Sequence, residues 1–520
     1  MSSTSTFTGV AVLAISSYTI YSLTKLFYRV FLHPLARFPG PRLAAATYLY
    51  EAYYDVWKGG QFLFHLDVLH DQYGPVVRVS PDEIHVRDSE WFHTLYTGPG
   101  HVRDKFARSI RANGSPGAVA SASKHDHHKL RRAALNPFFS KRAIDDLQYE
   151  IQQKVDKMCD RISREYARPG ISLEIGTAFT ALTMDVITSY CFGESKGCLD
   201  EDNFGPRWKR LMTTAFAITP IAKHFPIMMR IRAAIPPRIV VRLIPSMAGF
   251  VEVRQEIHAQ GAAILAEKAR GDSTLTGDDS EKAKTVFHGI LQAEIPDEEK
   301  TVQRMADEAF VLIIAGAETT AKVLTVILAH LLQEPNLIHR LRAEMSAIAA
   351  NGQPLALRQL ENIPLFRAVI QEGLRVAGPV TNRQMLMAPN EDLRYTARDG
   401  SHDVVIPRGT PVSMTIRSVL NDPAIFPNPD RFDPERWLRA AEQGVRLDRY
   451  LVTFSKGLRA CVGMNLSQCE LYLGVAALIS KFDMTLEDFD YARDLKVTRD
   501  HFIGAPSVGA KEIRVKVVDR

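Results

Sequence analysis

Cysteine is scarce in this chain. The 520 residues include five cysteines, an odd number whose spacing forms neither a disulfide framework nor a zinc-type cluster with histidine. We therefore expect free thiols and a reducing compartment. Cys191 and Cys198 are close enough in the sequence for a disulfide, but two free thiols are the preferred interpretation.

The chain also lacks a strong net charge, an internal repeat and any flavin, nicotinamide or iron–sulfur motif. A formal net charge of +5 and a pI near 8.8 are too weakly basic to indicate nucleic acid binding. Hydrophobic residues make up 46% of the chain, which is enough for a large core. Length alone favours several domains, but the informative segments are spread over the whole chain and favour one intertwined body.

Charged residues are absent from the N-terminal end of the sequence. No charge occurs before Lys25, and positive residues follow the apolar run only on its C-terminal side. This pattern predicts a transmembrane helix at about residues 7–28, within an anchor at 1–32, and a body that faces the cytosol. A secretory signal peptide is the alternative, disfavoured because a basic n-region and a clear cleavage site are missing. A proline-rich hinge at 33–42 then precedes a single domain at 43–520.

Acidic residues are absent from residues 206–250, where eight lysines and arginines occur. Prolines divide this stretch, and interleaved apolar residues make it amphipathic, so we expect several short helices. Two interpretations stay open for it. One is a mobile lid that rests on an anionic membrane surface, and the other is an ordinary helical subdomain.

Three further patterns predict local structure. Apolar runs on either side of a Ser-Pro-Asp turn predict a β-hairpin at residues 76–86, and a similar pattern predicts one at 404–412. A polar, glycine-containing run predicts a surface loop at 271–284.

One stretch near the C-terminus reads Phe-Ser-Lys-Gly-Leu-Arg-Ala-Cys-Val-Gly, from Phe454 to Gly463. Its glycines allow the backbone to turn tightly and to approach a flat group closely. Backbone N–H groups and Arg459 can stabilise a thiolate at Cys461, and a following helix at 464–481 would add its positive end. The stretch therefore indicates a thiolate metal ligand, with a buried free cysteine as the alternative.

A second informative stretch lies in the middle of the chain. No proline interrupts residues 297–333, and the apolar run there predicts one long buried helix. Inside the run, Ala315 begins the string Ala-Gly-Ala-Glu-Thr-Thr. Thr319 can bond to the carbonyl of residue 315 and loosen the helix, and Glu318 beside it is suited to proton transfer. A kinked helix with a salt-bridged glutamate is the alternative.

Both stretches resemble motifs of the cytochrome P-450 (heme-thiolate monooxygenase) superfamily, and the resemblance covers about residues 35–518. The first matches the heme loop Phe-x-x-Gly-x-Arg-x-Cys-x-Gly, and the second matches Ala/Gly-Gly-x-Asp/Glu-Thr-Thr/Ser. The resemblance implies a mainly α fold with a small β region and heme b as cofactor. It makes Cys461 the axial ligand of the iron and assigns proton relay to Glu318 and Thr319.

The resemblance also assigns residues that hold the cofactor, the core and the substrate. The implied cofactor-binding residues besides Cys461 are Arg132, His128 (where the superfamily commonly has tryptophan), Arg383, Arg459, Phe454 and Gly463. Glu372, Arg375 and Arg436 would form a buried structural ion triad. The implied substrate pocket consists of Phe310, Ile314, Ala315, Val380, Phe502 and Ile503.

These assignments imply a single-pass protein of the endoplasmic reticulum membrane that oxidises a hydrophobic small molecule with dioxygen. Because the chain has no electron-carrying motif of its own, electrons would come from NADPH through a separate cytochrome P-450 reductase. Lys129, Arg131, Lys456 and Arg459 are expected to form its cationic docking face.

The stretch at residues 128–141 resembles the fungal microsomal branch that tailors terpenoids and polyketides, so a terpenoid is the first expectation for the substrate. Two alternatives to a monooxygenase stay open. One is a reductase-independent heme-thiolate isomerase or dehydratase, and the other is a non-enzymatic heme-binding sensor.

Overall fold

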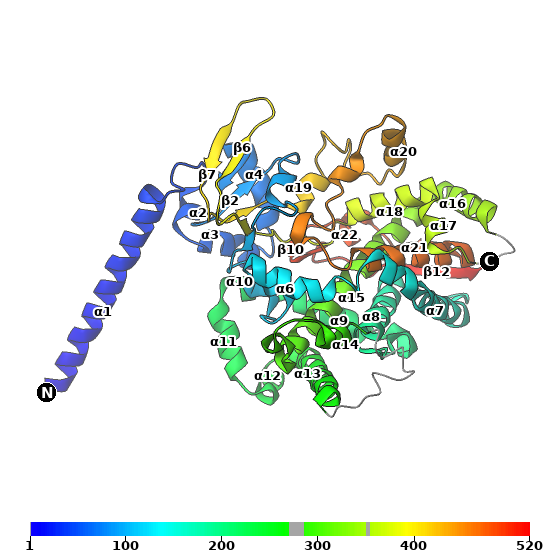
Figure 1. Cartoon of the computed structure of the whole chain (residues 1–520), viewed down its shortest axis with the longest axis horizontal. Helices are drawn as coiled ribbons and strands as arrows, with labels where there is room; N and C mark the ends of the chain where they lie inside the picture. The colour runs from blue at the N-terminus through cyan, green and yellow to red at the C-terminus, as the bar shows by residue number, and fades with distance from the viewer. Residues whose placement is uncertain (1, 270–284, 350–353) are drawn as a thin grey trace.

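The computed structural model describes residues 2–269, 285–349 and 354–520. Helices dominate the body (Figure 1). Short strands lie at the end of the body next to the N-terminal helix, and others lie near the C-terminus (Figure 1). The predicted surface loop at 271–284 lies outside the described residues. A mainly α fold with a small β region is therefore confirmed.

The long helix α15 (Val302–Gln333) runs through the middle of the body (Figure 1). It begins later than predicted, because Asp297–Lys300 form a separate 3-10 turn. The hydroxyl of Thr301 accepts the backbone N–H of Arg304 at 3.3 Å and caps the helix there. α15 packs against α8 (Ile175–Phe192), α13 (Ala248–Ala269), α18 (Pro364–Ala377) and α21 (Met464–Lys481).

The other helices surround this centre. They are α2 (Arg42–Ala46), α3 (Leu49–Ala52), α4 (Phe62–Tyr73), α5 (Phe92–Leu95), α6 (His125–Leu135), α7 (Lys141–Tyr166), α14 (Val286–Gln292), α16 (Pro335–Ile348), α17 (Leu357–Glu361), α19 (Ile416–Leu420), α20 (Glu435–Glu442) and α22 (Tyr491–Asp494). The main apolar core takes side chains from Val119 to Val517, so distant parts of the chain share one interior.

In the part of the chain that the structure describes, the strands form four small sheets. The largest has the order β1 (Val76–Arg78), β2 (Ile84–Val86), β8 (Val412–Ser413), β5 (Leu386–Met387), β3 (Asp104–Lys105). The others are β4 (Leu173–Glu174), β12 (Arg514–Asp519) and β9 (Phe482–Glu487), then β6 (Leu393–Thr396) with β7 (Asp403–Ile406), and β10 (Arg499–His501) with β11 (Ile503–Ala505). The predicted hairpin at 76–86 is confirmed, since β1 and β2 pair antiparallel.

The hairpin predicted at 404–412 is wrong. β7 pairs with the preceding strand β6, whereas β8 lies parallel to β2 in the main sheet. The segment between them begins and ends with Pro407 and Pro411, which cannot donate ladder hydrogen bonds. The chain therefore passes from one sheet to another at this point.

The N-terminal helix α1 (Ser2–Phe27) projects away from the body (Figure 1). With the π-helical turn Tyr28–Leu32 it gives an apolar segment at Phe7–Leu32 that is long enough to cross a membrane and is not buried in the protein. α8 and α15 are also long and apolar enough, but 89% and 56% of their windows lie inside the body. Those two helices are therefore core helices.

The predicted proline-rich hinge at 33–42 is packed onto the body. Leu35 and Phe38 are buried in the core beneath the main sheet, at 2% and 7% exposure. The carbonyl of Pro39 accepts the backbone N–H of Arg78 at 2.7 Å. The prolines restrict the backbone of this segment, so residues 33–42 follow a fixed path along the body.

Short helices make up residues 206–250, as the prolines predict. They are α9 (Pro206–Ala217), α10 (Thr219–His224), α11 (Pro226–Ala234), α12 (Pro237–Leu243) and the 3-10 turn Pro245–Met247. A proline occupies the first or second position of each of these elements, where it costs no helical hydrogen bond.

Candidate active site

Cys461 lies in a loop that leads into α21. A 3-10 turn at Gly457–Arg459 comes first, and the backbone N–H of Cys461 then donates to the carbonyl of Phe454 at 2.9 Å. Gly457 has φ 69°, and a side chain there would collide with the carbonyl of Thr97. This glycine therefore serves the packing of the loop on the body, and not the approach to a cofactor that the sequence suggested.

Cys461 is an exposed residue, although the protein groups around its sulfur are dense enough to desolvate it. Burial raises the pKa of the thiol, while the backbone N–H of Gly463 and the charge of Arg132 lower it. The nearby cation is therefore Arg132, whereas the sequence suggested Arg459. A thiol with a raised pKa becomes a thiolate at neutral pH when a metal ion binds it.

The surroundings of this sulfur fit a flat metal-containing group. A Cβ atom added to Gly463 would meet no protein atom within 4 Å, so the backbone next to Cys461 faces open space. The N–H of Gly463 points at the sulfur and would spread a thiolate's charge.

Four basic side chains gather beside this loop, and we call them the cationic cluster: Lys105, His128, Arg132 and Arg459. Burial, followed by the charges of Arg459, Lys105 and Arg132, lowers the pKa of His128 to about 3. Burial and Arg459 lower the pKa of Lys105 to about 7, and burial lowers that of Arg459 to about 10. The cluster therefore carries more positive charge than its surroundings compensate.

The hydrogen bonds of the cationic cluster go mainly to backbone carbonyls. Lys105 donates to Ala120 at 2.9 Å, Arg132 to Ala460 at 2.8 Å and Arg459 to Ala122 at 2.6 Å. Asp104 acts on Arg459, but this carboxylate is paired with Lys124 at 2.9 Å. A carboxylate-bearing ligand is what such a cluster binds best, so these residues fit the propionates of a heme.

Helix α15 presents a second group of functional side chains. The hydroxyl of Thr319 donates to the carbonyl of Ala315 at 2.7 Å, as the sequence predicts. Ala315 is exposed although most of the surrounding helix is buried, so this part of α15 borders an accessible space. Glu318 Oε2 is buried without a hydrogen-bond partner, and burial raises the pKa of this carboxyl.

Gly316, next to Ala315 on α15, faces the neighbouring helix α8. A Cβ atom at Gly316 would lie 3.0 Å from Ile187 of α8, so this glycine permits close packing of two helices. In addition, the hydroxyl of Thr183 on α8 donates to the carbonyl of Ala317 at 2.9 Å. Of these two small residues, Ala315 is the exposed one and leaves the more open space for a ligand.

A family comparison decides what this arrangement is. The family model described as "Cytochrome P450" (cytochrome P-450) matches residues 49–500.

The chain belongs to the cytochrome P-450 family.

Curated relatives agree with this assignment. The chain is 38% identical over 502 residues to the cytochrome P-450 monooxygenase MO6277 of Ascocoryne sarcoides, covering 95% of this chain and 96% of the relative. It is 36% identical to the tryptophan 6-hydroxylase fscE of Fusarium equiseti, covering 94% of this chain and 93% of the relative. It is 35% identical to the cytochrome P-450 monooxygenase TRI4 of Fusarium sporotrichioides, covering 98% of this chain and 96% of the relative. The protein is therefore a P-450 monooxygenase of the fungal branch, with a heme-iron cofactor.

A solved structure shows the same fold. The retinoic acid bound cyanobacterial CYP120A1 aligns with a TM-score of 0.68 over 93% of this chain and 99% of that chain. At 21% identity this likeness concerns the fold alone.

Arg383 does not join the cationic cluster of this P-450, and we withdraw it from the predicted propionate-binding set. Its guanidinium donates to Glu51 at 2.7 Å and to Glu83 at 3.2 Å, and the side chain is almost fully buried. Two carboxylates from distant parts of the chain already compensate its charge. Although burial opposes the charge, these carboxylates raise the pKa of Arg383.

Arg383 instead belongs to a buried set that we call the ionic network: Glu51, Asp55, Glu83, Arg108, Lys223 and Arg383. Lys223 lies 2.6 Å from Glu51 and 3.1 Å from Asp55. Because Lys223 is on α10 and the two carboxylates are on α3 and the adjoining π-helical turn Tyr53–Trp57, the network holds the 206–250 segment against the N-terminal part of the body.

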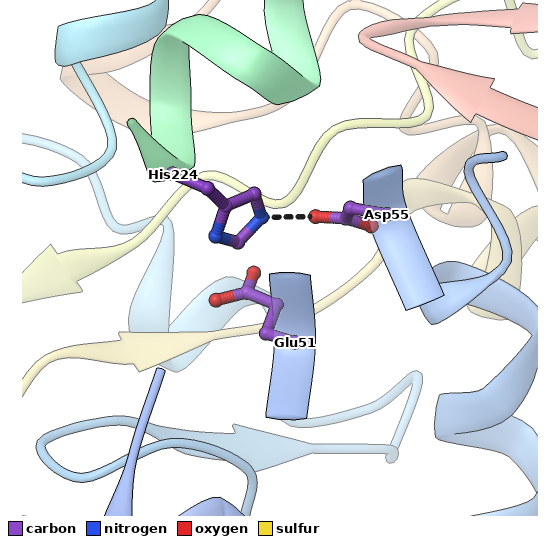
Figure 2. Close-up of side chains that lie close together, drawn as sticks. All are labelled: Glu51, Asp55 and His224. Carbon is purple, nitrogen blue, oxygen red and sulfur yellow. Dashed lines mark hydrogen bonds and ion pairs between the residues drawn. The ribbon is translucent and has the colours of Figure 1, made fainter. Parts of the chain in front are cut away.

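Figure 2 shows three members of this region that could bind a metal by residue type: Glu51, Asp55 and His224. His224 Nε2 lies 2.8 Å from Asp55 Oδ2. The ammonium of Lys223 bridges the same two carboxylates and takes the place of a cation there. We therefore interpret this cluster as a structural ion network.

The substrate role of the predicted pocket residues stays a prediction, and the structure shows only where their side chains pack. Phe310 is buried against Phe250 of α13, with ring centroids 5.4 Å apart. Val380 and Ile503 form a β-bridge, which places the C-terminal hairpin beside the segment after α18. Phe502 stacks on Phe216, with centroids 6.0 Å apart and planes at 10°. Ile314 and Phe454 are partly buried against the main core.

The structure brings the predicted ion triad together. Arg375 Nη2 lies 2.8 Å from Glu372 Oε1, and Arg436 Nε lies 3.1 Å from the same oxygen. Trp437 Nε1 donates to Glu372 Oε2 at 2.9 Å. Glu372 therefore lies between two arginines and an indole in a buried site.

The predicted reductase-docking face needs correction. Arg131 is buried, with Nε 2.6 Å from Glu299 Oε2, and Arg459 is buried with its bonds to backbone carbonyls. Neither can present its charge at the surface. Lys129 is exposed and Lys456 is partly exposed, so these two remain.

Sequence reasoning missed several residues near the site. Lys105 belongs to the two-residue strand β3, and no sequence pattern around it indicates that it is part of the cationic cluster. Phe216 lies on α9, and only its contact with Phe502 relates it to the C-terminal hairpin. Lys322, one turn after Glu318 in an apolar helix, could have been noticed as a charge at an unusual place.

Proposed function

We propose that this P-450 oxidises a hydrophobic small molecule of secondary metabolism, first a terpenoid and second a polyketide. The observation that carries this proposal is the Cys461 sulfur, which accepts the N–H of Gly463, lies near Arg132 and is open to a bound group. Cys461 would hold the iron of the cofactor, for which we propose heme b. The cationic cluster would hold its propionates.

Bound heme supplies the iron at which dioxygen is reduced, and thiolate ligation favours cleavage of the O–O bond. The protein's own groups supply the protons. The Thr319 hydroxyl forms a hydrogen bond with the carbonyl of Ala315, next to the accessible space at that residue. It can therefore donate a proton to a ligand bound there. Glu318, with its raised pKa, supplies that proton.

The pair Glu318 and Thr319 favours a monooxygenase of this kind over a reductase-independent isomerase or dehydratase. Those enzymes do not reduce dioxygen and therefore need no protons for that reaction. The pair also disfavours a heme-binding sensor, which needs no proton supply. We propose that electrons reach the site from NADPH through a separate reductase, which docks near Lys129 and Lys456.

We propose that residues 1–32 anchor the protein in the endoplasmic reticulum membrane by a single span, with the catalytic domain in the cytosol and residues 33–42 as the connection. The apolar helix α1 supports this anchor. Exposed apolar side chains on α11 and α12, such as Ile227 and Leu243, alternate with exposed Arg230 and Arg242. These helices lie on the side of the body from which α1 projects (Figure 1), so they suit a lipid surface.

The test is reconstitution of the full-length protein with NADPH and a P-450 reductase in membranes. A panel of terpenoids, polyketides and tryptophan derivatives is supplied, and products are followed by mass spectrometry. We expect an oxygen-containing product from a terpenoid or polyketide that requires NADPH, reductase and dioxygen. Turnover without NADPH would indicate an isomerase or dehydratase, and heme-loaded protein without any product would favour a sensor.

The variant Thr319→Ala sharpens this test. We expect it to bind heme normally and to divert NADPH consumption into hydrogen peroxide, since proton delivery is impaired. Thr325→Ala is the matched control, because the Thr325 hydroxyl makes the same kind of bond to the carbonyl of Ala321 two turns further along α15. Unchanged product yield in Thr319→Ala would contradict the role of this hydroxyl.

A further inference from the structure

Lys322 is the only charged side chain between Glu318 and the end of α15 at Gln333. Its neighbours Ala321 and Val323 are buried at 3% and 2% exposure. A spacing of four residues places Lys322 and Glu318 on the same face of the helix. A lysine in an apolar helix is costly unless its surroundings use it, so its contacts are informative.

The ammonium of Lys322 has one direct partner and one open side. Nζ donates to the carbonyl of Gly504 in the C-terminal hairpin. Lys322 also lines a cavity of about 50 Å³, which is enough for a few water molecules. Other groups in its wall are Val326, Asn421, Asp430, Tyr491, Lys496 and Arg417.

The outer wall of this cavity reaches solvent. Lys496 and Asp430 form an ion pair at 3.0 Å, and their side chains are 43% and 67% exposed. Water can therefore reach the cavity from outside, and Lys322 both borders this cavity and acts electrostatically on the buried carboxyl of Glu318. Glu318 itself does not line the cavity.

Two lysines act electrostatically on Glu318, namely Lys322 and Lys209, and their pKa values show that Lys322 is the one able to exchange its proton. Burial lowers the pKa of Lys322 to about 8, so its ammonium can release and regain a proton near neutral pH. Lys209 on α9 is paired with Glu174 and Glu512; although burial opposes its charge, these carboxylates raise its pKa. Lys209 therefore keeps its proton.

We propose that Lys322 is the proton-supplying residue that recharges Glu318 from the solvent-connected cavity during turnover. This inference rests on the proposed monooxygenase function. The ammonium of Lys322 gives a proton to the carboxylate of Glu318, and the resulting amine takes a proton from a hydronium ion in the cavity. Reduction of dioxygen with insertion of one oxygen atom consumes two protons and two electrons, so the relay acts twice per product, and the electrons come from the reductase.

Two substitutions separate proton supply from the contact with Gly504. Lys322→Gln keeps an N–H donor for the Gly504 carbonyl but carries no exchangeable ammonium proton. Lys322→Arg keeps both the donor and the charge, but a guanidinium does not release its proton at neutral pH. We expect both variants to lose about a hundredfold or more in NADPH-driven product formation, because positioned proton donors contribute ~10²–10⁴ to rates.

The pH profile gives a second readout. Wild-type product formation should fall as the pH rises through about 8, since the Lys322 ammonium is then lost, and both variants should lack this fall. The solvent deuterium isotope effect on product formation should be larger in the variants. Lys209→Gln is the matched control, and we expect it to keep the wild-type pH profile.

Hydrogen peroxide distinguishes the failure of this inference from failure of the proposed function. Peroxide already carries the two protons, so peroxide-driven oxidation should be equal in the wild type and in Lys322→Gln. The relay would be overturned by wild-type NADPH-driven rates in Lys322→Gln, by full activity in Lys322→Arg, or by an equal loss with peroxide. Absence of product in the wild type with both oxidants would instead remove the monooxygenase function.

Discussion

The ionic network and the cationic cluster are both buried, but their charges are balanced differently. In the ionic network, three carboxylates face three cations, and the carboxylates and cations stabilise one another: the pKa of Glu51 is lowered and that of Lys223 is raised although burial opposes both charges. In the cationic cluster, the pKa values of His128, Lys105 and Arg459 are all lowered, first by burial.

This difference teaches how to tell a structural site from a binding site. Buried charges that compensate one another need nothing from outside, and they fix the relative position of the elements that carry them. Buried charges of one sign are stable only when a ligand of the opposite sign joins them. We therefore propose a structural role for the ionic network and a cofactor-binding role for the cationic cluster.

The largest expected effect comes from breaking the ionic network. Arg383→Leu leaves Glu51 and Glu83 without this partner in a buried site, which should lower the free energy of unfolding by about 3–5 kcal/mol. Thermal and urea unfolding measure it. Arg394→Leu is the control, since that arginine pairs with Asp403 at the exposed surface, where solvent screens the charges, and should lower the stability far less. Equal stability of the two variants would refute the structural role.

A smaller loss is expected from the cationic cluster, and it should appear in cofactor binding. Lys105→Met removes one cation with little change in volume. Hydrogen bonds between charged groups contribute about 1.5–3 kcal/mol, so heme should dissociate roughly 10- to 100-fold faster. Transfer of heme to an excess of an acceptor protein gives this rate. Lys124→Met, at the exposed edge beside Asp104, is the control, and retention of heme by Lys105→Met at the wild-type rate would argue against the cluster.

These two sites also show what sequence reveals. The Cys461 loop and the Glu318–Thr319 pair were predicted because each consists of neighbouring residues, so spacing alone fixes their geometry. Arg383 was assigned wrongly because its partners Glu51 and Glu83 lie about 300 residues away and only the folded chain brings them together. Lys105 was missed for the same reason.

The fold follows a similar division. The C-terminal end of α15 and the subdivision of 206–250 follow from apolar runs and prolines, which act locally. The pairing of β7 with β6, and the collision of a side chain at Gly457 with Thr97, depend on segments that no local pattern relates.

The pH dependence of heme-free protein should sharpen the comparison further. Lys105 has a folded pKa of about 7 against an ordinary value of 10.5. Between these values the unfolded chain binds more protons, so the stability of heme-free protein should rise with pH, by at most about 1.4 kcal/mol per pH unit. Urea unfolding across this range measures it. Lys105→Met should lack the rise, and an identical rise in that variant would assign it to another group.

The smallest effect is expected at His128. Its lowered pKa keeps the imidazole neutral at pH 7, so it contributes no charge to the cluster. His128→Phe should therefore change heme dissociation by no more than about fivefold, the effect of a hydrogen bond worth about 1 kcal/mol. The heme-transfer assay used for Lys105→Met applies. A loss equal to that of Lys105→Met would mean that His128 is charged in the cofactor-loaded protein.

The central claim is that the sulfur of Cys461 binds heme iron, and the absorption spectrum of the reduced, carbon monoxide-bound protein tests it most directly. We predict the red-shifted Soret band of thiolate-ligated heme in the wild type and in Cys469→Ser, which alters a buried cysteine of α21. Cys461→Ser should lose this band. A folded, heme-loaded wild type without the band, or its persistence in Cys461→Ser, would contradict the account.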